Sequence, residues 1–583
     1  MIYIVTTDHY GAVRAELSAP GGPFATTEIV VRGVPMRVMN AAPPHMRAVW
    51  ESTAPFAERT YLVYEDERYT YAEIAAQVRA VANYLRSAHG VGSGDRVAIA
   101  MRNYPEWVVA YWATVSIGAA VVGMNAWWTP SEIEFGLSDS GPKVLIADSE
   151  RLERVVGVIE RLREKAPLHV IAVRTTSELP ADSVRWDDVA NADGAPASLP
   201  DATIDPDDDA CIFYTSGTTG YPKGAQLTHR GSVHNVMNLV FMSTASQLAE
   251  TRAVAAGDLP APTGPAPTPP EQNVFMAPTP LFHVTANNCI LQPATLGGGR
   301  VVLTYKWDPA RALELIEREK VTTFSGVPTM SRELLMHPDW ATRDTSSLLG
   351  LGGGGAALQP DLVGKIAGAL KNGAPSTGYG LTETHGIVTA NSARNFLAKP
   401  DSCGPVVPTL DAKLVDDEGN DLPESPTTVG QLCVRGTVVI KGYLNRPEAT
   451  AESIVDGWFN TGDIARIDEA GYVYIVDRAK DMVLRGGENV YCSEVETAIY
   501  EHDAVAEAAV FGIPDERLGE EVAAAIVLRP GGVLDAAGLK AHLAERLAKH
   551  KVPAQVWFLD EPLPRNANGK FVKRELRKQL TGA

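Results

Sequence analysis

The feature that most constrains this fold is a repeated alternation between short apolar, β-branched runs and segments with helical spacing. Strand-like runs include residues 96–100, 143–147 and 300–304, while helical segments such as 72–88 and 309–320 lie between them. This alternation is typical of α/β layers, in which largely parallel strands are covered by helices. The first four-fifths of the chain therefore predict layered α/β subdomains.

The chain is too long for one compact core, so several packed units are expected. Its 583 residues exceed the length of roughly 250–300 at which single cores stop growing. Near Gly471 the pattern changes, and a charged link at 477–481 precedes a shorter mixture of helices and strands. We predict an N-terminal extension over residues 1–44, a large domain over 45–476, a hinge over 477–481 and a small α+β domain over 482–583.

One stretch of the large domain differs from the rest in composition. Residues 243–271 are rich in Ala, Pro, Thr and Gly. Such a segment buries little apolar surface, so we expect an exposed insertion loop. Two interpretations stay open, a tolerated surface insertion and a lid over a substrate entrance.

The charge balance excludes some classes of partner. Lys and Arg total 52 against 71 Asp and Glu, which gives a formal net charge of −19. Such a chain repels nucleic acid and anionic membranes as bulk partners. An anionic substrate would therefore need a local site lined by cations or backbone amides.

The cysteines favour a reducing compartment. They are scattered and form no CxxC pair, which indicates reduced thiols and argues against a metal cluster. Residues 1–8 lack the basic leader and apolar stretch of a secretory signal, so we expect a cytoplasmic protein. The five cysteines are Cys211, Cys289, Cys403, Cys433 and Cys492.

One uncharged stretch is long enough to cross a membrane. Residues 107–128 carry no charge, which meets the length criterion for a membrane-spanning helix. Both flanks continue as α/β pattern, however, so a buried helix over 105–117, a break at Gly118 and a buried strand over 119–124 explain the stretch better. We expect no integral membrane span.

The most informative segment is a loop rich in glycine and hydroxyl groups, residues 214–224, which follows a buried-strand candidate at 210–214. Glycines let backbone N–H groups turn toward an anion, hydroxyls donate to phosphate oxygens, and a lysine adds positive charge. The P-loop motif of common NTPases does not fit, because a strand-like run rather than a helix follows. The candidate phosphate ligands are Thr215, Ser216, Gly217, Thr218, Thr219, Gly220 and Lys223.

This loop resembles the signature loop of the adenylate-forming superfamily, and further motifs of that superfamily follow in the expected order. The resemblance covers nearly all of the chain beyond about residue 45. It implies a large domain of layered α/β subdomains with a β-barrel-like part, and a small mobile C-terminal domain. It also implies ATP and CoA as cosubstrates and Mg²⁺ as cofactor.

Residues 377–383 are similar to the second nucleotide motif of the superfamily. Tyr379 offers a flat face for adenine, Thr382 a hydrogen bond to the α-phosphate, and Glu383 a hard oxygen for Mg²⁺. The glycine-rich segment 352–358 matches the segment that lies along the adenine in relatives. Further ATP contacts implied by these two segments are Gly355, Ala356, Thr377, Gly378 and Gly380.

Two more motifs supply the acid and ribose contacts. Residues 278–283 match a motif in which an aromatic side chain lies beside the acyl carboxylate, so we assign His283 a positioning role in catalysis. A carboxylate nucleophile needs no base at neutral pH. The resemblance places Asp463 on the ribose hydroxyls and Arg478 on the ribose or α-phosphate.

The last motif, residues 564–570, carries the lysine that is essential in the superfamily, here Lys570. A desolvated ammonium can bridge the attacking carboxylate and the α-phosphate, two anions that must approach each other. In relatives the small domain then rotates about a hinge residue, which corresponds to Lys480. The rotation implies CoA binding by Gly486 and Gly487.

The sequence thus predicts an ATP-dependent carboxylic acid–CoA ligase that forms acyl-AMP and pyrophosphate, then acyl-CoA and AMP. A medium- or long-chain fatty acid or another hydrophobic acid is the favoured substrate. Two alternatives stay open: an acyl-AMP ligase that loads a carrier protein, and a non-catalytic sensor of nucleotide or acyl-adenylate. The oligomeric state is open, with a homodimer among the options.

Overall fold

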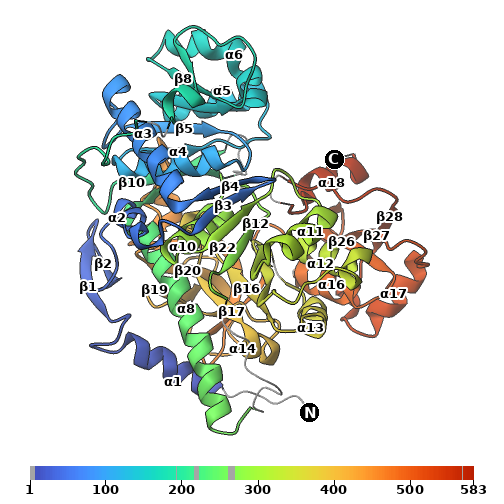
Figure 1. The fold of residues 1–583 in the computed structure, drawn as a ribbon. Coiled ribbons are helices and arrows are strands. Elements are labelled where there is room, and N and C mark those ends of the chain that lie inside the picture. Colours follow the sequence, from blue (N-terminus) through green and yellow to red (C-terminus); the bar gives the residue numbers. More distant parts are fainter. Residues whose placement is uncertain are drawn as a thin grey trace.

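The computed structural model describes residues 7–191, 194–215, 222–259, 270–356, 358–423, 425–486, 488–566 and 569–582. In this part of the chain the strands form five sheets. Two large sheets with their helices and a half-barrel sheet make up the main body, and a smaller sheet belongs to the C-terminal region (Figure 1). The chain has the α/β fold with a separate C-terminal domain that the sequence predicts.

The first large sheet has seven strands in the order β11-β10-β6-β5-β7-β8-β9. All neighbours are parallel except β10 and β11, which form an antiparallel pair. Helices α3 and α4 pack on one face, and α5 and α6 on the other. The strands are β5 (Arg96–Ala100), β6 (Ala120–Gly123), β7 (Val144–Asp148), β8 (His169–Val173), β9 (Ser183–Arg185), β10 (Asp209–Thr215) and β11 (Lys223–Thr228). The helices are α3 (Tyr71–His89), α4 (Pro105–Ser116), α5 (Pro130–Ser140), α6 (Ser149–Arg163) and the short α7 (Trp186–Val189).

The second large sheet has eight strands in the order β17-β16-β15-β14-β12-β13-β3-β4. Helices α11, α12 and α13 cover one face. The strands are β3 (Thr60–Tyr64), β4 (Glu67–Thr70), β12 (Val274–Ala277), β13 (Arg300–Leu303), β14 (Thr323–Gly326), β15 (Gly350–Gly354), β16 (Ala374–Tyr379) and β17 (Thr389–Ser392). The covering helices are α11 (Pro309–Glu319), α12 (Pro328–Met336) and α13 (Pro360–Ala369), and α14 (Ala393–Ala398) follows β17.

The opposite face of this sheet is turned toward a helical layer that runs through the middle of the molecule. The layer consists of α8 (His229–Ala255) and the consecutive segments α9 (Val284–Ala286), η2 (Asn287–Leu291) and α10 (Gln292–Leu296). Segment η2 has π-helical geometry, which is found mostly as single turns at functional sites. In Figure 1, α8 is the long green helix in front of the sheets.

The third part is an antiparallel half-barrel in the order β18-β23-β22-β20-β19. It follows the second sheet in the chain and packs against α8 through a shared apolar core. Its strands are β18 (Gly404–Pro405), β19 (Leu410–Val415), β20 (Gly430–Gly436), β22 (Trp458–Ile467) and β23 (Tyr472–Arg478), with α15 (Pro447–Ser453) and β21 (Ile454–Val455) between β20 and β22.

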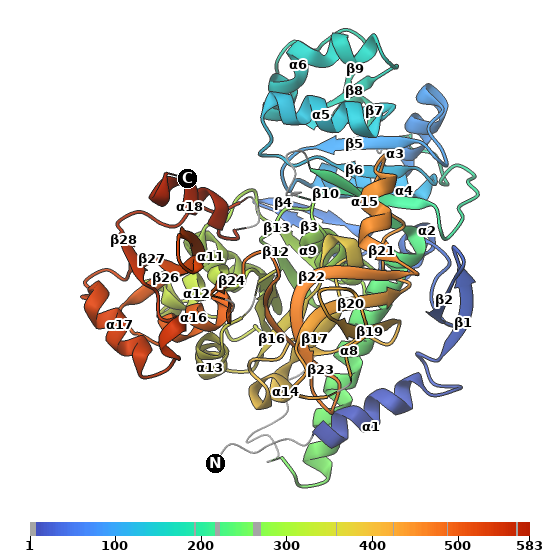
Figure 2. The same cartoon turned by 180° about the vertical axis from the view of Figure 1, so that it is seen from behind.

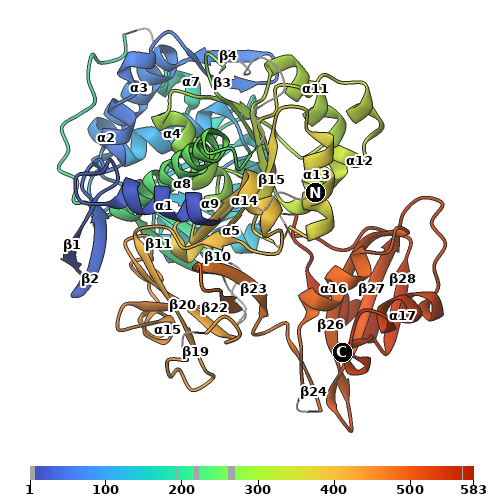
Figure 3. The same ribbon diagram turned by 90° about the horizontal axis from the view of Figure 1, so that it is seen from below.

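The C-terminal region has cores of its own. Its sheet has the order β25-β24-β27-β26, with β28 paired to β27. Figure 3 shows this sheet standing apart from the half-barrel and joined to it by the link after β23. The elements are β24 (Val483–Arg485), β25 (Glu488–Val490), α16 (Cys492–Tyr500), β26 (Val505–Asp515), β27 (Gly519–Leu528), α17 (Ala536–Ala544), β28 (Gln555–Leu559) and α18 (Lys573–Thr581).

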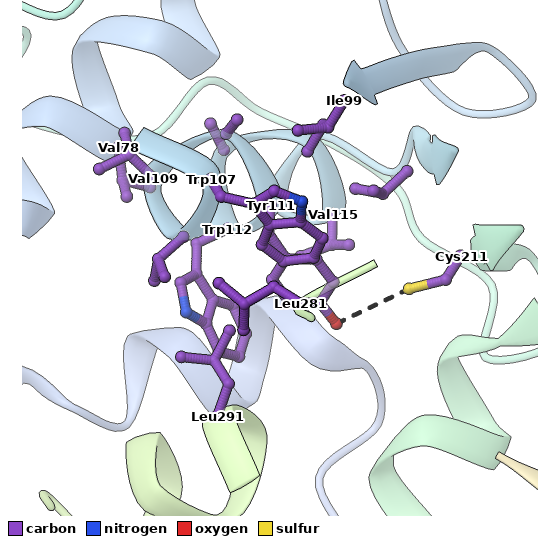
Figure 4. Packing of buried hydrophobic residues seen from close by; sticks show 14 of the residues in the cluster. Val78, Ile99, Trp107, Val109, Tyr111, Trp112, Val115, Cys211, Leu281 and Leu291 are labelled. Atoms are coloured by element: carbon purple, nitrogen blue, oxygen red, sulfur yellow. Dashed lines mark hydrogen bonds between the residues drawn. The ribbon is translucent and has the colours of Figure 1, made fainter. Parts of the chain in front are cut away.

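The uncharged stretch from residue 107 to 128 is a buried helix followed by a buried strand, as the sequence predicts. Every residue of α4 except Glu106 is buried, including Trp107, Tyr111 and Trp112. Figure 4 shows these rings packed together, with the hydroxyl of Tyr111 3.9 Å from the Sγ of Cys211. Among the described helices, none has the length and apolar character needed to cross a bilayer.

The N-terminal extension packs on the main body. Helix α1 (Thr7–Ser18) lies against α8, and strands β1 (Thr26–Val31) and β2 (Val34–Met39) form a hairpin beside the half-barrel (Figure 2). The Arg14 guanidinium donates to the backbone carbonyl of Val406 at 2.6 Å, and Arg37 donates to that of Leu410 at 2.6 Å. Helix α2 (Met46–Glu51) follows the hairpin and packs against α4.

The predicted insertion loop at 243–271 is wrong for its first half. Residues up to Ala255 continue helix α8, and Ala245, Ala249 and Ala253 are buried along one side of it. Alanine has the highest helix propensity, and its repeat at intervals of four gives a face on which α1 packs. Residues 260–269, which include most of the prolines, lie outside the described part.

Candidate active site

A large cavity lies where the carboxyl ends of β12, β15 and β16 meet β10, the half-barrel and the C-terminal domain. Its volume is about 1860 Å³. Ligands of open α/β sheets bind beyond the carboxyl ends of the strands. Among the predicted site residues, the cavity is lined by Thr215, Lys223, His283, Gly355, Thr377, Gly378, Gly380, Thr382, Glu383, Arg478, Lys480 and Lys570.

The predicted phosphate loop joins two antiparallel strands. Thr215 at the end of β10 pairs with Lys223 at the start of β11, and the Thr215 hydroxyl is 3.5 Å from the Lys223 carbonyl oxygen. The strand after Lys223 is the feature by which the sequence excludes a P-loop. Residues 216–221 of the predicted loop lie outside the described part of the chain, so only its two ends are placed.

Tyr443 connects Lys223 with the second nucleotide motif. Its ammonium is 5.1 Å from the ring centre of Tyr443, and the Tyr443 hydroxyl donates to Glu383 Oε1 at 2.9 Å. Burial raises the pKa of the Glu383 carboxyl, while the Tyr443 hydroxyl lowers it. The ends of the loop and the predicted Mg²⁺ ligand therefore face the same part of the cavity.

A metal at this site would depend on the substrate for most of its ligands. In the described part of the chain, no three His, Cys, Asp or Glu side chains are grouped closely enough to hold a metal ion. Mg²⁺ keeps several waters and commonly uses one or two carboxylates with substrate phosphates. A single carboxylate such as Glu383 at the cavity wall fits that mode of binding.

The predicted ribose and adenine residues contact each other. The Tyr379 hydroxyl donates to Asp463 Oδ2 at 2.6 Å, and the Arg478 guanidinium is 3.2 Å from Asp463 Oδ1. Asp463 and Arg478 are paired across β22 and β23, which fixes their separation. Burial raises the pKa of Asp463, and the neighbouring Arg478 lowers it. Tyr379, Asp463 and Ala356 are not part of the cavity lining.

Lys570 reaches the cavity from the C-terminal domain. Its backbone N–H bonds to the Asn566 side chain at 3.1 Å, and the Asn566 N–H bonds to its carbonyl at 2.8 Å. Its amine extends over Gly355, where an added Cβ would come within 3.1 Å of Lys570 Cε and 3.5 Å of Nζ. Gly355 has a φ of +80°, so its backbone conformation as well as its lack of a side chain suits this contact.

Burial controls the charge state of Lys570 and His283. Desolvation, with a contribution from Arg478, lowers the pKa of Lys570 to about 8, while Asp463 and Glu383 raise it. Desolvation and the Lys570 charge lower the pKa of His283 to about 3, so its imidazole is neutral. At neutral pH the Lys570 amine is therefore largely protonated and the His283 ring is neutral.

The predicted CoA residue Gly486 lies away from the cavity, whereas the predicted hinge residue Lys480 lies at its edge. Gly486 is exposed at the turn between β24 and β25, has a φ of +61° and does not line the cavity. Gly487 lies outside the described residues. Lys480 is exposed in the link after β23 and lies at the cavity edge. This arrangement places Lys570, rather than the β24–β25 turn, at the cavity.

Sequence reasoning missed Tyr443 and Glu333. Tyr443 contacts both Lys223 and Glu383. Glu333 of α12 forms an ion pair with Arg565 of the C-terminal domain at 3.2 Å. Neither residue belongs to a motif with a local spacing signal. Both contacts join residues far apart in the sequence, so a single sequence contains no pattern that could have revealed them.

Comparison with known proteins agrees with the order and placement of these motifs. The sequence profile described as AMP-binding enzyme matches residues 49–444, and the one described as AMP-binding enzyme C-terminal domain matches residues 494–570. The first profile alone covers more than half of the chain.

Similar proteins include a feruloyl-CoA synthase from Amycolatopsis sp, 37% identical over 514 residues that cover 88% of this chain and 94% of that protein. A long-chain-fatty-acid–CoA ligase from Bacillus subtilis is 32% identical and covers 91% of this chain and 93% of its own length. Among solved structures, the anthranilate CoA ligase AuaEII in complex with anthranoyl-AMP matches with a TM-score of 0.79 at 26% identity, covering 93% of this chain and 98% of that one. The chain belongs to the AMP-binding enzyme family, and within it to the acid–thiol ligases.

Proposed function

We propose that this protein activates a hydrophobic carboxylic acid as its acyl-adenylate and then transfers the acyl group to CoA. The observation that carries the proposal is the position of Lys570, whose amine lies over Gly355 and close enough to His283 and Asp463 to affect their pKa values. A cation at this place serves the approach of two anions, a carboxylate and a phosphate.

In the first step an oxygen of the acid attacks the α-phosphorus of ATP, and the bond to the bridging oxygen of pyrophosphate breaks. Negative charge then spreads over the transferring oxygens, and Lys570 stabilises it from a desolvated position. With a pKa of about 8, the Lys570 amine is largely protonated at pH 7. His283 stays neutral and orients the acid, because a carboxylate nucleophile carries no proton to remove.

The ATP site is proposed to include the predicted nucleotide residues. Thr215 and Lys223 would hold the phosphates, with Ser216, Gly217, Thr218, Thr219 and Gly220 completing the loop. Asp463 and Arg478 would contact the ribose, and Tyr379 the adenine. Mg²⁺ bound with ATP would neutralise phosphate charge, and Glu383 is the residue that would hold it.

In the second step the CoA thiol attacks the acyl carbonyl, a thioester bond forms, and AMP leaves with its phosphate oxygen. We propose that rotation of the C-terminal domain about Lys480 exchanges Lys570 for the turn containing Gly486 and Gly487 at the reacting centre. The small separate sheet and its own cores support movement as a unit. A cytoplasmic location fits the five free cysteines.

The space for the acyl group is proposed to lie along the face of the second sheet that is turned toward α8. On this face four adjacent strands present small side chains, which leave room between sheet and helix. Register places Thr323, Gly350 and Ala374 in one row, Ser325, Gly352, Ser376 and Ser392 in the next, and Gly354, Gly378 and Ala390 in the third. All of these except Gly352 line the cavity.

The opposite wall is helical. Thr285, Cys289, Pro293 and Gly297 line the cavity at intervals of four, so one side of α9, η2 and α10 faces it. Residues Leu239, Ser243 and Ser246 of α8 line it further along. A strand of five residues such as β15 is about 17 Å long. A channel of this length, lined mostly by small uncharged residues, suits a medium-length aliphatic chain or an aromatic acid with a linker.

The test measures pyrophosphate and AMP release from ATP with Mg²⁺, with and without CoA, across fatty acids of increasing length and aromatic acids such as ferulate. The proposal predicts acid-dependent pyrophosphate release, with AMP turnover that requires CoA. Release that a carrier protein supports and CoA does not would assign the second step to a carrier. ATP binding without pyrophosphate release from any acid would indicate a sensor and contradict the proposal.

A further inference from the structure

The segment that carries Lys570 is tied to the large domain through one arginine. Arg565 and Phe571 form an isolated antiparallel bridge, and the Asn566 N–H donates to the Lys570 carbonyl at 2.8 Å, so Lys570 lies next to the base of the hairpin that Arg565 and Phe571 close. The Arg565 guanidinium also lies 5.3 Å from the ring centre of Phe571. Movement of Arg565 therefore moves the Lys570 backbone with it.

The two terminal nitrogens of the Arg565 guanidinium bond to carboxylates of different domains. Nη1 donates to Glu333 Oε1 of α12 at 3.2 Å, and Nη2 donates to Glu507 Oε1 within the C-terminal sheet. A planar guanidinium presents its donors in a fixed geometry, which suits it to bridging two carboxylates. Arg565 is thus held by its own domain and reaches across to the other.

Glu333 is itself held in place. Its Oε2 accepts from Trp307 Nε1 at 2.5 Å, and Trp307 packs on Phe324 of β14 with ring centres 5.7 Å apart. Strand β14 leads directly into α12, whose N-cap is Val327. Glu333 therefore presents its second oxygen to Arg565 from a helix that continues directly from β14, the strand whose Thr323 and Ser325 line the cavity.

A second contact lies at the other end of the hairpin. Gly569 has a φ of +78°, and a Cβ there would come within 3.1 Å of Val327 Cγ2. The hairpin is thus seated on the start of α12, while the ion pair anchors it about 1.7 turns further along the same helix. In Figures 1 and 2, α12 lies next to the C-terminal domain.

We propose that the Glu333–Arg565 ion pair is a positioning contact that holds the C-terminal domain in the orientation in which Lys570 reaches the cavity. This inference rests on the proposed function, because it assigns the ion pair to the adenylation step. The thioester step does not use Lys570 at the reacting centre. Loss of the ion pair therefore slows the first step and spares the second.

The test compares Glu333→Ala with Glu317→Ala. Glu317 forms an ion pair with Arg343 at 2.8 Å within the large domain, and the two glutamates have similar side-chain exposure, 33% and 35%. Partly exposed ion pairs contribute modestly, so we expect Glu333→Ala to lower the kcat of acid-dependent pyrophosphate release about 3- to 10-fold. Thioester formation from supplied acyl-adenylate stays within about 2-fold of the unsubstituted enzyme, and Glu317→Ala changes neither step.

Two further readouts separate positioning from general destabilisation. In an Arg565→Ala background, Glu333→Ala should cause no additional loss, because the partner is already absent. If Glu333→Ala unfolds the protein, Glu333→Gln keeps the shape and an acceptor for Trp307 while removing the charge. Equal loss in both half-reactions, or additive effects of the two alanine substitutions, would overturn the inference.

Hydrogen exchange makes the inference testable apart from activity. Peptides covering 328–336 and 565–571 should exchange faster in Glu333→Ala than in the unsubstituted protein, and Glu317→Ala should leave them unchanged. Absence of pyrophosphate release from the unsubstituted enzyme would refute the proposed function. Unchanged exchange in Glu333→Ala would refute the positioning contact whether or not the enzyme is active.

Discussion

Three ionisable side chains share the poorly solvated end of the cavity, and burial changes each pKa in the direction that favours the neutral form. Desolvation lowers the pKa of Lys570 to about 8 and that of His283 to about 3, and it raises that of Glu383. Burial disfavours the charged form of any group. Lys570 keeps most of its charge at neutral pH, as its proposed role in adenylation requires.

The lowered pKa of Lys570 predicts how adenylation responds to pH. The protonated amine is the active form, so kcat/KM for the acid should fall about tenfold per pH unit above roughly pH 8. With ATP held well below its KM, kcat/KM reports the enzyme without bound nucleotide, in which no ATP phosphate raises the pKa. Measurement of pyrophosphate release between pH 6 and pH 10 checks this. A kcat/KM that stays constant to pH 10 would contradict it.

At this scale the sequence identifies the residues of motifs but not their contacts. Lys570, Glu383 and Lys223 stand in short local patterns, and all three line one cavity. The bond between Tyr379 and Asp463 joins residues 84 positions apart. A contact of that kind depends on how β16 and β22 are packed, and composition and spacing along one chain do not determine it.

At the scale of elements, the acyl space depends on strands that carry small residues on one face. An added Cβ at Gly350 would find Thr323 Cγ2 at 3.9 Å as its nearest neighbour, which is an ordinary contact. At Gly352 an added Cβ would come within 1.8 Å of the Ser376 carbonyl oxygen. Gly352 is therefore required for packing, whereas Gly350 leaves free space toward the cavity.

Gly350→Val is expected to narrow the proposed channel without disturbing the sheet. Its isopropyl group would occupy cavity space, so we expect the KM for the longest acids accepted to rise about tenfold, with short acids little changed. The measurement is pyrophosphate release across an acid-length series, with the melting temperature as control. If acid preference does not change while the substituted protein stays folded, the channel lies elsewhere.

The alternation of strands and helices could be predicted because each element carries its own periodicity. The prediction fails at residues 243–255 because an alanine-rich helix end adjoins a proline-rich run, and composition averaged over both does not separate helix from loop. In the structure Ala245, Ala249 and Ala253 form a buried face of α8. Helix α1 packs on α8, and no pattern in the sequence predicts that these two distant segments meet.

At the scale of the whole molecule, two bodies meet over the cavity and are joined by a short link after Arg478 at the end of β23. Lys480, the proposed hinge residue, lies exposed in this link. The Cys492 N–H of α16 donates to the Asp477 carboxylate near the end of β23, so this bond spans the link. The proposed rotation about Lys480 is expected to break it.

Lys480→Pro tests the rotation. Proline fixes φ near −65° and restricts the residue before it, so it limits the backbone change that a rotation requires. We expect thioester formation to fall at least about tenfold while acid-dependent pyrophosphate release in a single turnover stays within about 3-fold. Lys480→Ala is the matched control for loss of the side chain. A matched loss in both steps would remove the hinge assignment.

The central claim is that Lys570 supplies the charge for adenylation and is dispensable for the thioester step. The most direct measurement is single-turnover pyrophosphate release and, separately, thioester formation from supplied acyl-adenylate, in Lys570→Ala and in the exposed control Lys578→Ala. The account predicts a loss of about 10²–10³-fold in the first step for Lys570→Ala alone, with the second step retained. Equal loss in both steps, or unchanged pyrophosphate release, would contradict it.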